Sequence, residues 1–364
     1  MSPQILFRVD ASLKIGSGHV MRCLTLADEL IRRGAYCIFV TRLHVGHLVD
    51  VIRARGHEVF ALKNNGALNQ LQVNQDTYRE WLSVDWLTDA EQTKNAIQAR
   101  VFDWLIVDHY ALDSQWETAL RDHAKKIFVI DDLANRKHNC DVVLDQNLGR
   151  ESVDYDAWLK PQVKRLVGPG YALLRPEFAQ WRDMSLARRK GNPMLKLLVS
   201  MGGVDQDNIT GKVLHAIDHL DMPIGIHIDV VLGVSAPWVE EVKKQAIGMR
   251  YATTVHENIS NMAELMAKSD LAIGAAGSTS WERCALGLPA ILFLLADNQR
   301  EVLKALEISG AAKVASVKTF TNMTAFGKLL LGVRENLKLM SENSASICDG
   351  LGAGRVAEML LGER

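Results

Sequence analysis

The stretch that decides the fold is QILFRVDASLKIGSGHVMRCLTLADEL, residues 4–30. It opens with a short apolar run, residues 5–9, of the kind that forms a buried strand. After a glycine-rich turn, apolar residues recur at helical spacing on one face: Val20, Leu24, Ala27, Leu30 and Ile31. Gly34 follows as a C-terminal stop. A strand that leads through a tight turn into an amphipathic helix predicts the first repeat of an α/β fold.

The same alternation continues along the chain. We expect strands at residues 36–40, 57–62, 103–109, 126–131 and 140–145, then at 195–201, 225–233, 271–276 and 290–295, with helices between most of them. The fold class is therefore α/β, with two Rossmann-like, doubly wound domains.

The domain boundaries follow from length and composition. Residues 176–193 are polar, basic and bracketed by prolines, so we interpret them as an interdomain linker. The N-terminal domain is then 1–175 and the C-terminal domain 194–364. Open parallel sheets bind ligands at the carboxyl ends of their strands, so we expect the two domains to face each other across a cleft.

Composition narrows the function classes. The 364 residues carry 42 Lys plus Arg and 43 Asp plus Glu, without the basic surplus of a general nucleic-acid binder, so we expect no nucleic-acid partner. The five cysteines are widely spaced and include no C-x-x-C pair, which argues against a zinc site. The longest apolar run, AILFLLA, is far below the roughly 20 residues of a membrane span. We therefore expect a cytoplasmic protein with no stable membrane association.

The turn GSGH, residues 16–19, is the first candidate site. Gly16 and Gly18 would let a ligand approach the backbone at a helix start. There the helix dipole disfavours imidazolium, so His19 could act as a neutral base near pH 7. Asp10, at the end of the preceding strand, could orient it. The alternative is a capped turn in which Ser17 is the N-cap and His19 has no chemical role.

Two further strand-to-helix loops could hold a nucleotide. In SMGGVDQDN, residues 200–208, Gly202 and Gly203 could approach a phosphate or sugar, or could simply form a turn capped by Asp207 or Asn208. A second loop, in residues 274–289, offers free amides and hydroxyls to a diphosphate and a carboxylate to a ribose: Gly277, Ser278, Thr279 and Glu282. Its alternative is a helix cap made by Ser278 with Glu282.

Other polar residues follow strands. Asn298 and Gln299 carry neutral amides suited to sugar hydroxyls or acetamido groups, or they could cap the next helix. We interpret four residues at strand ends as cap or turn residues rather than catalysts: Asp108, His109, Asp131 and Asp132.

These motifs in this order resemble a known family. RVDAS, IGSGHVMRCLTLA, VDHY, IDDLANR, CDVVLDQN, GPGYALLRPEF, SMGGVDQDN, GSTSWERCALGLP and ADNQ span nearly the whole chain and are similar to the UDP-sugar hydrolases of pseudaminic acid biosynthesis, in the GT-B group. A more distant similarity runs to the N-acetylglucosaminyltransferase of peptidoglycan synthesis.

The resemblance implies a reaction and a set of roles. The expected reaction is hydrolysis of UDP-2,4-diacetamido-2,4,6-trideoxy-β-L-altropyranose to the free sugar and UDP, without metal or cofactor. Apart from the resemblance, we expect the protein to be a monomer. His19 would be the general base, Glu282 would bind the ribose, and Ser278 with Thr279 the diphosphate. The sugar end would be lined by Asn298, Arg175 and Tyr78.

The residue chemistry is compatible with this reaction. UDP is a good leaving group, and helix-terminal amides can take up its charge, so a neutral histidine that activates water suffices. Attack at the anomeric carbon C1 would invert its configuration. Two alternatives stay open: a GT-B glycosyltransferase that uses a UDP-acetamido sugar, and a nucleotide-sugar binding protein without activity. A dehydrogenase is disfavoured, because neither glycine loop has dinucleotide-binding spacing.

Overall fold

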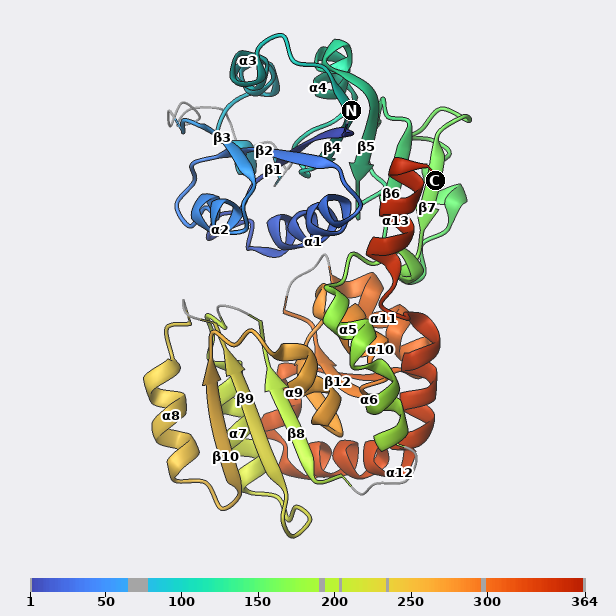
Figure 1. Cartoon of the computed structure of the whole chain (residues 1–364). Helices are drawn as coiled ribbons and strands as arrows, with labels where there is room; N and C mark the ends of the chain where they lie inside the picture. Colours follow the sequence, from blue (N-terminus) through green and yellow to red (C-terminus); the bar gives the residue numbers. More distant parts are fainter. Residues whose placement is uncertain are drawn as a thin grey trace. The chain divides into compact units, whose positions relative to one another are not determined.

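The structure is a computed structural model that describes residues 2–64, 78–189, 194–202, 205–233, 236–295 and 299–362. The chain forms two compact units. The first unit contains Met1–Leu174 together with Leu351–Arg364, and the second unit contains Arg175–Gly350 (Figure 1).

The first unit is built on a parallel sheet of seven strands, in the order β3-β2-β1-β4-β5-β6-β7. The strands are β1 (Gln4–Val9), β2 (Tyr36–Arg42), β3 (Glu58–Leu62), β4 (Phe102–Asp108), β5 (Ala124–Ile130), β6 (Val142–Asp145) and β7 (Lys164–Val167). Its helices are α1 (Gly18–Arg32), α2 (Val49–Ala54), α3 (Trp86–Ile97), α4 (Ser114–Ala119) and α13 (Gly352–Leu361). Short 3₁₀ turns lie at η1 (Arg79–Leu82), η2 (Arg121–His123), η3 (Ser152–Tyr155) and η4 (Pro169–Tyr171).

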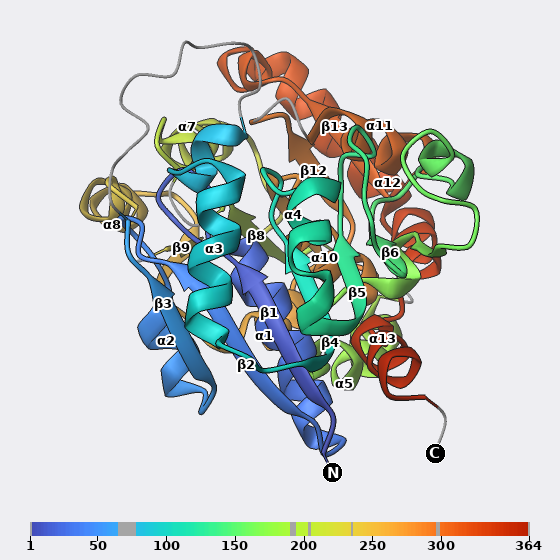
Figure 2. The same cartoon turned by 90° about the horizontal axis from the view of Figure 1, so that it is seen from above.

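Helices cover both faces of this sheet, and side chains therefore alternate between two cores. Ile5, Phe7 and Val9 point toward α1 and α13, whereas Leu6 packs on the opposite side with residues of α3 and α4. Figure 2 shows α3 and α4 lying across that second face. The period of two along each strand thus decides which face, and which helix, every strand-end residue meets.

The second unit has a parallel sheet of six strands, in the order β10-β9-β8-β11-β12-β13. The strands are β8 (Lys196–Ser200), β9 (His227–Leu232), β10 (Ala252–Glu257), β11 (Leu271–Ala275), β12 (Ala290–Phe293) and β13 (Ala312–Ala315). The helices are α5 (Pro176–Gln180), α6 (Arg182–Arg188), α7 (Ile209–Asp218), α8 (Val239–Ile247), α9 (Met262–Lys268), α10 (Thr279–Ala285), α11 (Arg300–Ile308) and α12 (Met323–Ile347), and η6 spans Val317–Thr321.

The structure confirms two Rossmann-like α/β units but changes the predicted boundaries. Most of 176–193 is not a free linker, because it forms α5 and α6. The second unit does not extend to residue 364, because α13 returns to the first unit and packs against α1. There the indole nitrogen of Trp104 donates to the carbonyl of Leu360 at 2.8 Å. Long-range packing of this kind leaves no trace in local composition.

The first helix follows the sequence prediction closely. Val20, Leu24, Ala27 and Leu30 are buried, and α1 ends just before Gly34, whose φ of +91° suits glycine. Ile31 is an exception, since it is 42% exposed.

Candidate functional site

His19 lies in the first turn of α1, close to the carboxyl end of β4. Its Nδ1 is 2.6 Å from Oδ1 of Asp108, the last residue of β4. The imidazole is 11% exposed and the carboxylate is fully buried. A carboxylate cannot donate when ionised, so Nδ1 carries the proton and Nε2 is left as an acceptor. Within the described residues no side chain or backbone group bonds Nε2. This is the arrangement of an oriented general base.

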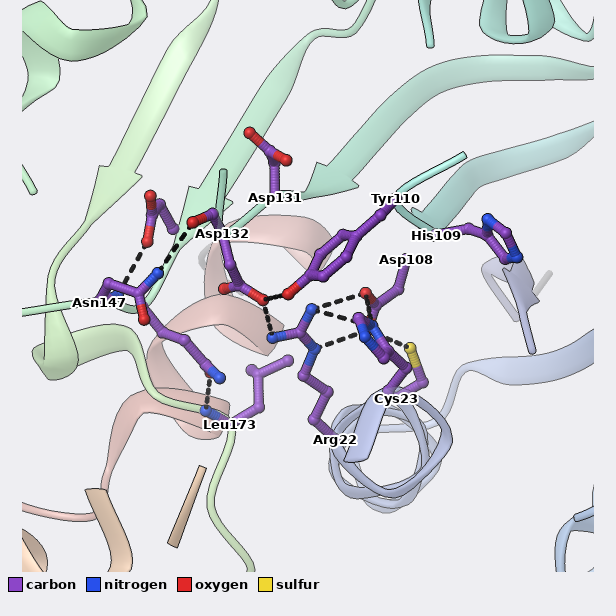
Figure 3. Close-up of polar contacts among 12 residues, drawn as sticks. Arg22, Cys23, Asp108, His109, Tyr110, Asp131, Asp132, Asn147 and Leu173 are labelled. Carbon is purple, nitrogen blue, oxygen red and sulfur yellow. Dashed lines mark hydrogen bonds and ion pairs between the residues drawn. The ribbon is translucent and has the colours of Figure 1, made fainter. Parts of the chain in front are cut away.

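Arg22, one helical turn after His19, holds the same carboxylate. Its Nε and Nη2 donate to Oδ2 and Oδ1 of Asp108, each at 2.6 Å (Figure 3). Its Nη1 reaches Oδ2 of Asp132, also at 2.6 Å. Burial alone would raise the pKa of Asp108, but the charge of Arg22 and the contact with His19 outweigh it and hold that pKa well below its usual range. Asp108 therefore stays ionised beside the imidazole.

An aromatic cluster, Tyr78, Trp81 and Tyr110, borders the imidazole. The Tyr110 ring meets His19 edge-on at a centroid distance of 4.7 Å, and Trp81 stacks on Tyr110 at 5.4 Å. Tyr78 contacts both of these rings edge-on. The Tyr110 hydroxyl donates to Asp132 at 2.7 Å. Burial and the Asp132 charge raise the pKa of Tyr110, so the hydroxyl remains a donor.

Asp10 does not orient His19, so that prediction was wrong. Residues 6, 8 and 10 point to the α3 face of the sheet, whereas α1 lies on the other face. Asp10 is fully buried there and accepts two bonds from Arg8 and one from the backbone nitrogen of Arg42. With no exposed surface, Asp10 is not placed to bind substrate either.

The strand-end pairs obey the same alternation. Asp108 and Asp132 are in register with residues 104, 106, 128 and 130, which pack toward α1. Their neighbours, His109 and Asp131, point to the opposite face, and Figure 3 shows His109 directed away from the Asp108 contacts. The sequence predicted cap or turn roles for all four residues, although the period of two could have singled out Asp108 and Asp132.

The GSGH turn keeps its helix end open. Gly16 has a φ of +80°, and α1 begins at Gly18 without a side-chain hydrogen bond from Ser17, so the predicted Ser17 cap is not formed. A Cβ added at Gly16 or Gly18 would meet no atom within 4 Å. Gly18 also has no positive φ, so nothing within the described residues requires glycine there.

The second unit has a comparable open helix start at α10. Gly277 and Ser278 are exposed, and the Ser278 hydroxyl makes no cap bond, so the predicted capping box with Glu282 is absent. A Cβ at Gly277 would meet nothing within 4 Å, in contrast to Gly274, where it would clash with the Ser200 carbonyl oxygen. The hydroxyl of Thr279, in the first turn, has no bond among the described residues.

Glu282 lies one turn into α10 and is half-buried without a hydrogen bond from any described residue. Burial raises its pKa, and the positive charges of Arg175 and Arg283 oppose that rise. Arg175 itself pairs with Glu177 at 3.1 Å and lies over the Phe178 ring. A half-buried carboxylate without a donor has the capacity to accept bonds from a ligand hydroxyl.

In the loop after β8, side chains of the loop itself already accept hydrogen bonds from the backbone amides at the start of α7. Asp205 accepts from the backbone nitrogens of Ile209 and Thr210, and Asn208 caps α7 by accepting from Gly211. The predicted Asn208 cap is confirmed. Gly202, with a φ of +97°, has open space at its Cβ position.

The remaining predicted residues are only partly placed. Gln299 is the N-cap position of α11, and its side-chain oxygen accepts from the Leu295 nitrogen at 3.3 Å. Gly203 and Asn298 lie outside the described residues. The first unit thus brings together His19 and Tyr78, and the second unit brings together Gly277, Ser278, Thr279, Glu282 and Arg175. Sequence reasoning missed the roles of Arg22, Trp81, Asp108, Tyr110 and Asp132.

In the part of the chain that the structure describes, no group of three or more His, Cys, Asp or Glu side chains is arranged to hold a metal ion. No helix there is long and apolar enough to cross a membrane.

Residues 200–356 match the glycosyltransferase family 28 C-terminal domain. An uncharacterized protein of Methanocaldococcus jannaschii is 28% identical over 306 residues, which are 82% of this chain but 57% of that protein. The UDP-2,4-diacetamido-2,4,6-trideoxy-β-L-altropyranose hydrolase of Campylobacter jejuni is 25% identical over 282 residues, 76% of this chain and 85% of the relative.

Among solved structures, MurG of Acinetobacter baumannii superposes with a TM-score of 0.70 at 16% identity, over 99% of both chains. At that identity the likeness shows the fold, which is that of the GT-B glycosyltransferases.

Proposed function

We propose that this GT-B-fold chain is an enzyme acting on nucleotide sugars, and that it hydrolyses a UDP-activated diacetamido sugar. The preferred substrate is UDP-2,4-diacetamido-2,4,6-trideoxy-β-L-altropyranose, the compound named for the Campylobacter jejuni relative. The observation that carries the proposal is the 2.6 Å contact between His19 and Asp108, which leaves Nε2 of the imidazole available. A protein that only bound the nucleotide sugar would have no use for an oriented base.

In the proposed reaction, a water oxygen attacks C1 of the sugar while Nε2 of His19 takes a water proton. The bond between C1 and the β-phosphate oxygen breaks, and its electron pair leaves with UDP. Configuration at C1 inverts, and the proton on His19 later passes to solvent. Asp108 holds the ring and its negative charge stabilises the imidazolium that forms. A base placed in this way typically contributes about 100- to 10,000-fold.

We assign the nucleotide to the second unit. The exposed start of α10 offers Gly277 and Ser278 amides to a diphosphate, because its first turn has no side-chain cap. The start of α7 is less suitable, since the Asp205 carboxylate already accepts from two of its amides. Glu282 would accept from ribose hydroxyls, an assignment supported by its lack of a protein donor.

The aromatic cluster gives the sugar end of the site a physical basis. Tyr78 and Trp81 are half-buried beside His19. Aromatic faces suit a sugar that carries a 6-deoxy methyl and acetamido methyl groups, because these present apolar surface. Gly18 would allow the sugar and the attacking water to come close to the helix end.

A glycosyltransferase is the second candidate, favoured by the family 28 match over residues 200–356. The same His19–Asp108 pair could take a proton from an acceptor hydroxyl instead of water. The two candidates differ in what UDP release requires.

The test is a UDP-release assay over a panel of UDP-acetamido sugars, without acceptor and in oxygen-18 water. We expect rapid stoichiometric release of UDP, with the label in the sugar and an inverted anomer by NMR. Release that needs an added lipid or sugar acceptor would establish the transferase instead. Label in UDP would mean attack at phosphorus and would reject the proposed chemistry.

Two histidine variants complete the test. His19→Ala should abolish UDP release while UDP binding survives. The matched control is His123→Ala, in the same unit but at the amino end of β5, where Nδ1 of the ring lies 3.3 Å from the Arg100 carbonyl oxygen. If His19→Ala leaves UDP release unchanged, His19 is not the base.

A further inference from the structure

Asp132 joins two groups that each contact the imidazole of His19. Its Oδ2 accepts from Nη1 of Arg22 at 2.6 Å and from the Tyr110 hydroxyl at 2.7 Å (Figure 3). Arg22 donates hydrogen bonds to both carboxylate oxygens of Asp108, the residue that bonds His19. The Tyr110 ring packs edge-on against the imidazole. Asp132 therefore lies behind both contacts without touching the ring itself.

The charges around His19 do not balance while the imidazole is neutral. Asp108 and Asp132 contribute two negative charges and Arg22 one positive charge, so the cluster carries a net charge of −1. The other nearby carboxylates have partners of their own, since Asp131 pairs with Arg136 and Asp145 with Arg150. Uptake of one proton by His19 brings the cluster to neutrality.

A second observation sets Asp132 apart. Its side chain is 14% exposed, and its Oδ1 is buried without a hydrogen bond from any described residue. An unsatisfied, buried carboxylate oxygen is costly, so a purely structural role would be served better by a neutral acceptor. The retained negative charge is thus the feature that needs an explanation.

We propose that Asp132 is a positioning residue that supplies the second negative charge for proton uptake by His19, and that it fixes the ring through Arg22 and Tyr110. The inference rests on the proposed function in one respect only, that His19 acts as a base. It extends that function by naming a residue that acts on the base from outside the substrate site.

The titratable and charged groups around His19 come from several elements. They are Arg22 and Cys23 from α1, Asp108 and Tyr110 from the end of β4, Asp132 after β5, and Tyr78 beside η1. Asp145 and Arg150 face Asp132 from behind. Burial and the charge of Asp132 raise the pKa of Asp145 to about 7.

The experiment follows the imidazole of His19 by NMR as a function of pH, in the full chain without substrate, with the signal assigned by its loss in His19→Ala. Asp132→Asn keeps the size of the side chain and an acceptor oxygen but removes the charge. We expect the titration midpoint of His19 to fall by about one pH unit, the lower end of the range for a charged neighbour because Arg22 lies between. The acid limb of the kcat/KM profile should move by the same amount.

Three controls separate charge from geometry. Tyr110→Phe removes the hydroxyl bond to Asp132 without a change in charge, so the midpoint should stay within error. Asp132→Glu restores the charge and should restore the midpoint. Glu29→Gln removes a carboxylate that pairs with Arg32 and Arg33 near the far end of α1, and it should leave the midpoint unchanged.

An unchanged midpoint in folded Asp132→Asn protein would overturn the inference. If that variant does not fold, Arg22→Gln provides the opposite perturbation, and its midpoint should rise; no rise would also overturn it. The titration needs no substrate, so a midpoint that moves in a protein without UDP-sugar hydrolysis rejects the proposed function alone. Confirmed hydrolysis with an immobile midpoint rejects the role of Asp132 alone.

Discussion

Replacement of Asp108 by asparagine should reduce both the activity that depends on His19 and the stability of the first unit, and the two effects can be worked out separately. Asp108 makes three contacts of 2.6 Å, one with Nδ1 of His19 and two with Arg22. Asparagine has one acceptor oxygen, which the fork of Arg22 would attract. Its amide group would then donate to Nδ1 of His19 and move the ring proton to Nε2. The ring could no longer accept a proton from water.

The expected loss of activity is the whole contribution of the base. We expect kcat to fall by about 100- to 10,000-fold, or about 3 to 5 kcal/mol in the barrier. Loss of one partner of a buried ion pair costs about 3–5 kcal/mol. In this variant Arg22 still has the carboxylate of Asp132 as a partner at 2.6 Å, so the lower value for the loss of stability applies. For a unit of this size, about 3 kcal/mol lowers Tm by about 6–12 °C.

The assay is UDP release under single-turnover conditions, with Tm from calorimetry on the same samples. Cys23→Ala is the matched control, because its thiol donates weakly to the same carboxylate at 3.5 Å and has no hydrogen bond with the imidazole among the described residues. It should keep nearly full activity. A folded Asp108→Asn protein with activity close to that of the parent would refute the assignment of His19 as an Asp108-oriented base.

Three further outcomes are expected. Gly18→Ala should leave Tm unchanged, since its Cβ meets no atom within 4 Å, but should raise KM for the UDP-sugar; an unchanged KM would show that no ligand approaches there. Glu282→Gln should weaken UDP binding about tenfold, the worth of a hydrogen bond to a charged group, and Glu264→Gln should not. Because the pKa of Glu282 is raised, the affinity for UDP, measured by calorimetry, should fall as the pH is lowered in the parent protein but not in Glu282→Gln. Burial would raise the pKa of Asp89, but the charge of Arg8 holds that pKa below its usual value. The stability that ionised Asp89 gives the first unit is therefore present above about pH 4 and is lost as the pH falls below that value. Hydrogen exchange at the Trp116 indole, which bonds Asp89, should therefore accelerate in acid, whereas a pH-independent rate would contradict this reading.

The sequence predicted the interior of each sheet and missed strands at the edges. Interior strands are buried on both faces and read as apolar runs, as in Phe102–Asp108. The missed strands β7, β10 and β13 each form one edge of a sheet. β10, with the sequence ATTVHE, has no fully buried residue. Half-exposed edge strands lack the apolar run on which the prediction depends.

The candidate site was found in part for a similar reason. His19 stands out because glycines surround it at a strand-to-helix junction. Asp108 and Asp132 come from two other strands, and only the sheet order β1-β4-β5 brings them to α1. Proximity along the chain pointed to Asp10 instead, which the period of two sends to the other face. Spatial neighbours contributed by separate strands are not encoded in local spacing.

The return of α13 to the first unit has a consequence for biosynthesis. In topological terms the second unit is an insertion within the first, entered at Arg175 and left at Gly350. The ribosome therefore completes the second unit before it has made Val356, Ala357 and Leu360, which cover part of the first unit's core. Domains usually finish folding in the order of synthesis. In this chain the first unit to begin is the last to be finished, and until then it exposes an apolar strip on which chaperones could act.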